Sequence, residues 1–296
     1  MKIMITGGCG HIGSNLFRQL PEHDITIVDN LRTQRYTSLF RVPRRVKFIQ
    51  KDINKLAFRD FNDIDVVIHL AAVVDAAGAE PEAIEEINVS QTKEFIEQCL
   101  SANIPKFIFP SSTSVYGMNA EKVWEDDMFV NPQSAYAESK ITIEQFLKES
   151  GLEYLILRFG TIFGTSPGMR FHTAINKFCW QASVDEPLTI WKESFHLLRP
   201  YLGLGDAIRA IRHFLHNPKY VNDTFNIITR NYKASDIVSM IERQNGKVKL
   251  NMVDTPLLNQ YSYEVSGEKA SAVGFHPTDN LQDAIGKTIQ LLKGLK

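Results

Sequence analysis

Short apolar runs recur along the first half of the chain, and stretches with helical spacing separate them. The first run ends in glycines and is followed by Ile12, Leu16 and Leu20, so we predict a strand, a tight turn and a helix over residues 12–20. Longer helices are predicted over 82–100 and 135–149. The runs predicted as strands are 1–5, 25–29, 46–50, 66–70, 107–109 and 152–158. Because strands that alternate with helices form parallel sheets covered on both faces, the predicted fold class is α/β, a doubly wound parallel sheet of the Rossmann type.

The pattern changes after residue 158. A loop is expected at 164–168 and a helix at 174–182, followed by short strand-like runs at 188–191, 225–228 and 248–253. We therefore predict two parts of unequal character. Residues 1–164 form the core, and residues 165–296 form mainly a smaller C-terminal cap, with segments around 200–230 returning to the core.

Composition narrows the classes of protein that fit this pattern. The 33 Lys and Arg residues nearly cancel the 34 Asp and Glu residues, which removes the basic surface expected of a nucleic-acid binder. Cys9, Cys99 and Cys179 are far apart without a CxxC pair, so we expect reduced thiols and no metal site. No run approaches the roughly 18 apolar residues of a membrane span. We expect a cytoplasmic protein with neither nucleic acid nor membrane as a partner.

Three glycines follow the first predicted strand at intervals of three. Gly7, Gly10 and Gly13 allow a sharp turn and a close backbone approach to a pyrophosphate at the start of a helix. Asp29 ends the next strand, where an acidic residue accepts hydrogen bonds from a ribose and repels a 2′-phosphate. The pattern predicts a dinucleotide site and favours NAD, although Arg32 and Arg35 keep NADP open.

Tyr136 and Lys140 lie one helical turn apart and therefore on the same face. A tyrosine that transfers protons near neutral pH needs its pKa lowered from about 10 toward 7, which costs about 4 kcal/mol. A neighbouring ammonium, together with an oxidised nicotinamide, supplies such a preference for the phenolate. The hydroxyl cluster 111–114 ends the fifth strand, at the sheet edge where open α/β sheets bind ligands.

These motifs resemble those of the extended short-chain dehydrogenase/reductases, specifically the nucleotide-sugar epimerase and dehydratase group. Within that group the resemblance is to enzymes of the UDP-glucose 4-epimerase type. The resemblance runs to about Gly164 and returns in 270–292. The segments that carry it are Thr6–Gly13, Asp29–Leu31, Asp52–Ile53, His69–Ala72, Asn88–Thr92, Ser111–Gly117, Tyr136–Lys140, Leu157–Arg158 and Gly274–Pro277.

The resemblance implies a role for each matching position. Tyr136 would be the catalytic base, Lys140 its activator and ribose anchor, and Ser112 the partner of the substrate hydroxyl. NAD would be held by Gly7, Gly10, His11, Ile12, Gly13, Asp29, Asn30, Asp52, Ile53, Leu70, Ala71, Ala72, Asn88, Tyr136 and Lys140. The nucleotide-sugar substrate would contact Ser112, Tyr136, Thr161 and Arg199.

The two residues after Ser112 select among the reactions of this group. Dehydratases of the group carry an Asp-Glu pair there, and decarboxylating members keep an acid at the second position, whereas this chain has Thr113 and Ser114. Neither hydroxyl is a general acid near neutral pH, which leaves epimerisation at C4 through a transient 4-keto sugar. The alternatives are an NAD-dependent nucleotide-sugar dehydrogenase or keto-sugar reductase, and a non-catalytic dinucleotide-binding module.

Some positions depart from the group's pattern. Thr161 stands where an asparagine is usual, and 256–261 lacks an expected second phosphate-binding arginine. Arg170 and His172 either compensate for it or form an exposed pair in a loop. Which nucleotide and which sugar are bound therefore stays open. Helices 82–100 and 136–149 resemble those that pair across dimers of the group, so a homodimer is expected.

Overall fold

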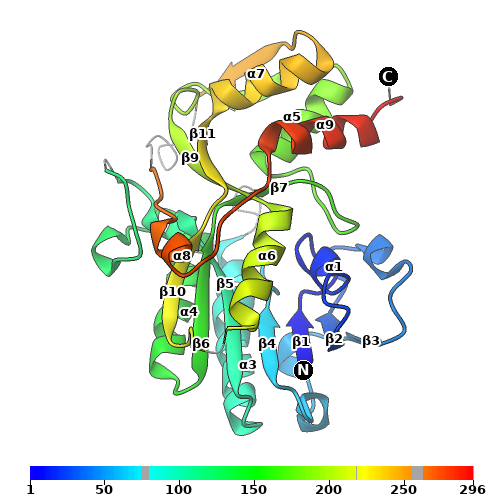
Figure 1. Ribbon diagram of the computed structural model, residues 1–296, viewed down its shortest axis with the longest axis vertical. Coiled ribbons are helices and arrows are strands. Elements are labelled where there is room, and N and C mark those ends of the chain that lie inside the picture. The colour runs from blue at the N-terminus through cyan, green and yellow to red at the C-terminus, as the bar shows by residue number, and fades with distance from the viewer. Residues whose placement is uncertain (75–79, 120, 218, 255–262, 296) are drawn as a thin grey trace.

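The chain folds around one large parallel sheet, as a computed structural model shows (Figure 1). The structure describes residues 1–74, 80–119, 121–217, 219–254 and 263–295. Among these, seven strands form the sheet in the order β10-β6-β5-β4-β1-β2-β3. Their bounds are β1 Lys2–Thr6, β2 Asp24–Asp29, β3 Val46–Gln50, β4 Val66–His69, β5 Lys106–Ser112, β6 Glu153–Phe159 and β10 Asp223–Ile227.

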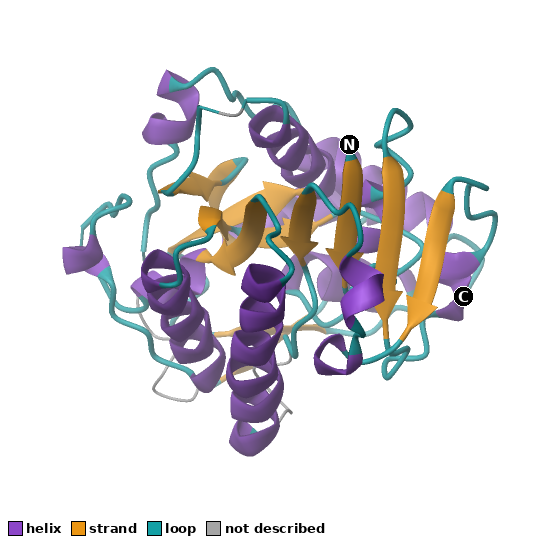
Figure 2. Cartoon of the chain, turned by 90° about the horizontal axis from the view of Figure 1, so that it is seen from below, coloured by secondary structure: helices purple, strands orange, loops and turns teal. Residues whose placement is uncertain are grey.

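Helices cover both faces of this sheet (Figure 2), which confirms the predicted doubly wound α/β fold. Successive side chains of a strand point to opposite faces. Ile3 and Ile5 of β1 pack in the cluster that contains helix α6 (Leu204–Leu215). Met4 packs in the cluster that contains α3 (Gln91–Ser101) and α4 (Ala135–Glu149). Burial on both faces explains why the central strands are apolar at nearly every position.

The strand order reverses between β1 and β4, which places a crevice at the carboxyl ends of these strands. In Figure 1 the strands run upward from the N-terminus, and the C-terminal elements gather beyond their upper ends. The sheet therefore presents its carboxyl edge to the second part of the chain.

In its described residues, the second part contains two small sheets and a group of packed helices. One sheet has the order β11-β9-β7, and the other pairs β12 with β8. A separate apolar cluster holds the helices against these strands. The bounds are β7 Thr161–Phe163, α5 Ala174–Ser183, β8 Leu188–Trp191, β9 Leu198–Gly203, β11 Arg230–Lys233, α7 Ala234–Asn245, β12 Leu250–Val253, α8 Glu268–Ala272 and α9 Leu281–Leu291. One strand of this half, β10, pairs with β6 in the large sheet.

Two predicted helices differ from the observed ones. The helix predicted over 12–20 is a single turn, α1 (Gly13–Leu16), and tighter bonds such as that from the N–H of Gln19 to the carbonyl of Leu16 follow it. The chain then meets Pro21, which has no N–H to continue a helix. The helix predicted over 82–100 consists of α2 (Pro81–Ile84), a π-helical turn η4 (Glu85–Ser90) and α3.

Short 3-10 helices fill the remaining connections. They are η1 Tyr36–Leu39, η2 Ile53–Lys55, η3 Phe58–Phe61, η5 Thr113–Tyr116 and η6 Asp127–Phe129. None of the helices in the described ranges is both long and apolar enough to cross a lipid bilayer.

Candidate active site

The glycine-rich turn after β1 packs too closely for side chains. Gly7 has a φ of +63°, and a Cβ on it would lie 2.7 Å from the backbone nitrogen of Ala71. A Cβ on Gly13 would lie 2.7 Å from the carbonyl oxygen of Gly7. Glycine is therefore required at both positions, and it brings the backbone of residues 7–13 to the carboxyl edge of the sheet.

This turn offers hydrogen-bond donors to a ligand. Within the described part of the chain, the N–H groups of His11 and Ile12 have no acceptor. The Nε2 atom of His11 is buried without a partner, while its Nδ1 atom lies 2.8 Å from the hydroxyl of Ser166. Burial, with Arg35 nearby, lowers the pKa of His11 to about 4, so the ring is neutral. Buried donors without acceptors are rare in folded proteins. An anionic pyrophosphate bound at this turn would supply the missing acceptor oxygens.

Two arginines surround the same turn. Arg35 lies against Gly10, and its buried Nε atom has no partner. Burial and the charge of Arg170 lower the pKa of Arg35 to about 10. Arg170 therefore faces the glycine-rich turn, and His172, although exposed, is close enough to lower the pKa of His11. Two repelling cations beside free N–H donors are complementary to a diphosphate.

The segment 166–168 packs on the glycine-rich turn from the second half of the chain, a long-range contact that no local sequence pattern predicts. The N–H of Gly168 donates to the hydroxyl of Ser14 at 3.0 Å. A Cβ on Gly168 would overlap the carbonyl of Cys9. Since Ser166 also holds His11, this segment fixes the turn that would bind the pyrophosphate.

The residues predicted at the ribose and adenine lie at the ends of β2 and β3. The carboxylate of Asp29 accepts from the N–H of Cys9 at 3.0 Å and from that of Leu31 at 2.8 Å. A carboxylate has about four acceptor positions, so Asp29 keeps capacity for ribose hydroxyls. The amide of Asn30 donates to Asp52, whereas the side chain of Ile53 is buried in the core.

The residues after β4 that are predicted to contact NAD lie against the glycine-rich turn. The Leu70 and Ala71 backbone lies against Gly7, and Ala72 follows half-buried. Asn88, in the π-helical turn, bonds to both the N–H and the carbonyl of Val73, at 2.8 and 3.0 Å. Its amide also donates to Ser139 of α4 at 3.2 Å. Asn88 therefore joins this strand end to the helix that carries Tyr136.

His69, at the end of β4, is a buried core residue. Its two ring nitrogens lie 2.9 Å from the hydroxyl of Thr6 and 3.4 Å from that of Thr92. Burial lowers its pKa to about 3, so it is neutral and unsuited to act as a base.

The structure brings Ser112, Tyr136 and Lys140 together at the carboxyl end of β5. Ser112 hydrogen-bonds with the phenol of Tyr136 and receives a bond from the hydroxyl of Ser114 at 2.9 Å. The Nζ atom of Lys140 lies 5.7 Å from the centroid of the Tyr136 ring and donates to the carbonyl of Pro110 at 3.0 Å. The Ser112 hydroxyl and the Tyr136 phenol thus meet where a substrate hydroxyl could exchange a proton, with the Lys140 ammonium near the phenol ring.

Burial opposes ionisation at this site. It raises the pKa of Tyr136 to about 12, against the hydrogen bond from Ser112, which lowers it. It lowers the pKa of Lys140 to about 8, although Glu144 counteracts this effect. At neutral pH the chain alone therefore holds a protonated phenol beside a charged ammonium, and Lys140 does not by itself activate Tyr136.

A buried ion pair, which none of the sequence motifs predicted, connects α4 to β6 next to this site. Arg158 and Glu144 are each 1% exposed, and the guanidinium contacts both carboxylate oxygens, at 2.6 Å for the shortest distance. Ser111 donates to the same carboxylate, and Arg158 donates to the hydroxyl of Tyr116 at 3.0 Å. Glu144 follows Tyr136 and Lys140 at intervals of four residues, and that spacing could have identified it.

The two residues predicted to select the reaction carry no acid. The hydroxyl of Thr113 is buried and donates to the carbonyl of Phe159 at 3.3 Å. Ser114 contacts Ser112 through both its N–H and its hydroxyl. These positions therefore supply no carboxylate beside the hydroxyls of Ser112 and Tyr136.

The predicted substrate residues lie in the small sheet next to this point. Ser112 pairs with Phe159, two residues before Thr161, and Thr161 pairs with Tyr201 in β9. The guanidinium of Arg199, also in β9, lies 5.3 Å from the ring centroid of Tyr263. The segment 256–261, where a second arginine was expected, falls outside the described residues.

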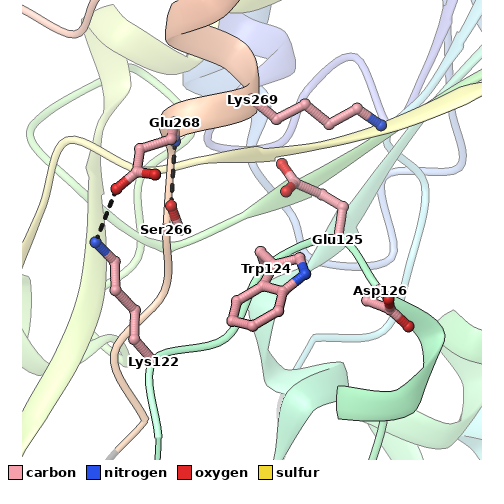
Figure 3. Close-up of a pocket in the computed structure, with 7 residues that line it drawn as sticks. All are labelled: Lys122, Trp124, Glu125, Asp126, Ser266, Glu268 and Lys269. Carbon is pink, nitrogen blue, oxygen red and sulfur yellow. Dashed lines mark hydrogen bonds and ion pairs between the residues drawn. The ribbon is translucent and has the colours of Figure 1, made fainter.

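A cavity of about 480 Å³ lies elsewhere, between α8 and the segment 122–126 (Figure 3). Lys122 and Glu268 form an ion pair across it at 3.1 Å, and the ring of Trp124 lies between the two segments. None of its lining residues belongs to the predicted site. The residues predicted for NAD and for proton transfer therefore lie at the carboxyl edge of the sheet and not in this cavity.

Comparisons with known proteins show which family the fold and sequence match. The model of the family described as "NAD dependent epimerase/dehydratase family" matches residues 3–227. The chain is 26% identical over 329 residues to the Bacillus subtilis (strain 168) protein named "Uncharacterized UDP-glucose epimerase YtcB", covering 100% of this chain and 99% of that one. It is also 26% identical over 317 residues to the dTDP-D-glucose 4,6-dehydratase of Bos taurus, covering 98% and 88%.

Solved structures extend the similarity to the whole fold. The UDP-glucuronic acid 4-epimerase of Bacillus cereus, in complex with UDP-glucuronic acid and NAD, is 28% identical, with a TM-score of 0.87 and coverage of 100% of both chains. Since epimerase and dehydratase sequences match at equal identity, the residues around Ser112 have to decide between the two reactions.

We predict that Glu144→Gln lowers the free energy of unfolding by about 3–5 kcal/mol, because it leaves the Arg158 charge buried and unpaired. Urea unfolding measures this loss, and Glu149→Gln, an exposed change on the same helix, is the control. A double variant with Arg158→Met should lose less than the sum of the two single changes. An unchanged midpoint in Glu144→Gln would contradict the role given to this pair.

We predict that Lys140→Met stabilises the fold near neutral pH while reducing activity. The folded pKa of about 8 lies below the ordinary 10.5, so the cost of burying the ammonium, about 3 kcal/mol, is fully present below pH 8 and disappears as the pH rises toward 10.5. After the lost bond to Pro110, a net gain of about 1–3 kcal/mol is expected at pH 7.

Unfolding of both proteins at pH 7 and at pH 10.5 checks this effect, with the exposed Lys148→Met on the same helix as control. A stability gap that does not shrink at the higher pH would show that the charge of Lys140 is not its cause.

Proposed function

This chain belongs to the NAD dependent epimerase/dehydratase family, and from that premise we propose that it is an NAD-dependent nucleotide-sugar epimerase. The reaction would interconvert a nucleotide-linked hexose and its 4-epimer through a transient 4-keto sugar, with no net redox change. One observation carries this proposal: Ser112 hydrogen-bonds with the Tyr136 phenol beside Lys140, while Thr113 and Ser114 bring no carboxylate to these groups.

The names of similar proteins support the substrate class. The Bacillus cereus structure contains UDP-glucuronic acid and NAD, and the Bacillus subtilis relative is named a UDP-glucose epimerase. We propose a nucleotide-sugar as the substrate and leave its base and sugar to experiment. When bound, NAD supplies the oxidant that accepts and returns the hydride of C4, and its positive charge favours the phenolate.

The residues of the chain would move and hold the proton. The Tyr136 oxygen accepts the proton of the C4 hydroxyl and later gives it back. The Ser112 hydroxyl, itself held by Ser114, shares the hydrogen bond to the substrate oxygen. The Lys140 ammonium stays near the phenol ring, and its bond to the Pro110 carbonyl fixes it to β5.

The same residues leave the 4-keto sugar one productive outcome. Elimination needs an acid and a base placed next to the sugar ring, but Thr113 is turned toward the Phe159 carbonyl and Ser114 toward Ser112. Return of the hydride to either face of C4 is then the remaining chemistry. Arg199, packed near Tyr263, would anchor a diphosphate while the sugar turns, with Thr161 beside it.

The remaining assignments are part of the same proposal. Residues 1–164 would bind NAD through the residues predicted for it, and residues 165–296 would mainly bind the substrate. We also propose a cytoplasmic homodimer that pairs through the helical stretch 82–100, which comprises α2, η4 and α3, and through α4. Sedimentation of the purified protein tests the dimer directly.

We predict that the protein binds NAD more tightly than NADP and that Asp29→Asn narrows this difference. The amide keeps an oxygen for the N–H groups of the glycine-rich turn, while the charge that repels a 2′-phosphate is lost. Calorimetric titration of both cofactors measures the two affinities. Equal binding of NAD and NADP by the unmodified protein would contradict the cofactor preference.

We predict that one member of a panel of UDP-, GDP-, CDP- and dTDP-hexoses is converted to its 4-epimer. NMR of the sugar protons follows the reaction, and Tyr136→Phe should slow it by at least about a hundredfold. Stoichiometric NADH would indicate a dehydrogenase, and loss of water would indicate a dehydratase. Cofactor binding with no turnover of any sugar would favour a non-catalytic module.

A further inference from the structure

A cluster of three metal-ligating side chains lies at the end of the sheet opposite the active site. Glu22 and His23 directly precede β2, and His216 is the C-cap residue of α6. The two segments are far apart in the sequence and meet at the lower end of the sheet in Figure 1, near the N-terminus. The cysteine pattern, which predicted no metal site, contains no information about this contact.

The distances within the cluster suit a small tetrahedral ion. The Oε1 atom of Glu22 lies 3.6 Å from Nε2 of His23 and 3.5 Å from Nε2 of His216. One ligand atom from each residue lies within 4.8 Å of the other two. Zinc binds nitrogen and oxygen at about 2.0–2.2 Å, which separates neighbouring ligand atoms by about 3.4 Å. The two distances from Glu22 to the histidine nitrogens are already close to this value. Rotation of the exposed His216 side chain can shorten the third distance, between the two histidines.

A second observation points to a ligand. His23 is 6% exposed, and its Nε2 atom is buried without a hydrogen-bond partner. Its other nitrogen, Nδ1, lies 3.5 Å from the amino nitrogen of Met1. The ring nitrogen without a partner is therefore the one that faces Glu22, and such a group is costly to bury unless it binds something.

The charges at the cluster are compatible with a cation and include one competitor. Burial and the neighbouring amino group of Met1 lower the pKa of His23, which favours the neutral ring that a metal ion binds. A backbone hydrogen bond and Arg212 lower the pKa of Glu22 and keep it ionised. The guanidinium of Arg212 lies 3.3 Å from the same Glu22 oxygen. Because its side chain is 41% exposed, it can turn into solvent when a cation arrives.

We propose that Glu22, His23 and His216 bind one zinc ion, with water at the fourth position. Two imidazoles and one carboxylate form a ligand set typical of zinc. The ion would join the loop before β2 to the C-terminus of α6, at the edge of the sheet opposite Tyr136. Its role would be structural, and the proposal is independent of the sugar chemistry.

Tag-free protein stripped with a chelator and titrated with ZnCl₂ by calorimetry tests this site. Wild-type protein should bind one equivalent and show a raised melting temperature. His216→Ala, an exposed change, should weaken binding at least about tenfold and lose the thermal shift. His276→Ala, another exposed histidine, is the control and should bind as wild type does. Arg212→Ala should bind zinc more tightly, because the competing cation is gone.

Cobalt provides a second readout of geometry. Tetrahedral Co²⁺ absorbs strongly in the visible range, so titration with CoCl₂ should give these bands in wild type and not in His216→Ala. Equal zinc binding by wild type and His216→Ala would overturn the proposal, and so would wild-type protein that binds no zinc. Unchanged binding in Arg212→Ala would contradict the assignment of Glu22 as a ligand.

Discussion

The buried ion pair between Glu144 and Arg158 is the interaction on which the arrangement of the active site depends. It joins α4, which carries Tyr136 and Lys140, to β6, and the Ser111 hydroxyl on the same carboxylate adds β5. Glu144 lies one helical turn beyond Lys140, so the pair fixes both the rotation and the height of the helix against the sheet. Any position of α4 that separated the two charges would leave each of them buried without a partner, which is costly. The ion pair therefore favours a single position of α4 against the sheet.

From this pair a chain of hydrogen bonds crosses the sheet. Arg158 donates to Tyr116, Tyr116 to Asn226 of β10, and the N–H of Asn226 to Glu125. The edge strand β10, contributed by the second half of the protein, is thereby connected to α4. The geometry of the candidate site is therefore a property of both halves of the chain, although the residues proposed to react come from the first.

The sequence predicted the parts of the fold that local pattern determines. The six early strands, α4 and the glycine-rich turn were found because apolar runs, helical spacing and glycine intervals are local features. The contact of Ser166 and Gly168 with that turn was missed, since 154 residues separate Gly168 from Ser14. The π-helical turn around Asn88 was missed for a related reason, because its side chain bonds to Val73 and Ser139 outside the helix. Glu144 was within reach of local reasoning through its spacing from Lys140, but its partner Arg158 is a tertiary contact.

In the proposed reaction, hydride leaves and returns to the same carbon while Tyr136 holds the proton. A substrate that carries deuterium at C4, converted in ordinary water and analysed by mass spectrometry and NMR, tests this directly. The 4-epimer should retain its deuterium at C4, because the deuterium passes to the bound nicotinamide as deuteride and returns from it without exchanging with water. Deuterium lost to the solvent, or found at another carbon of the sugar, would contradict it.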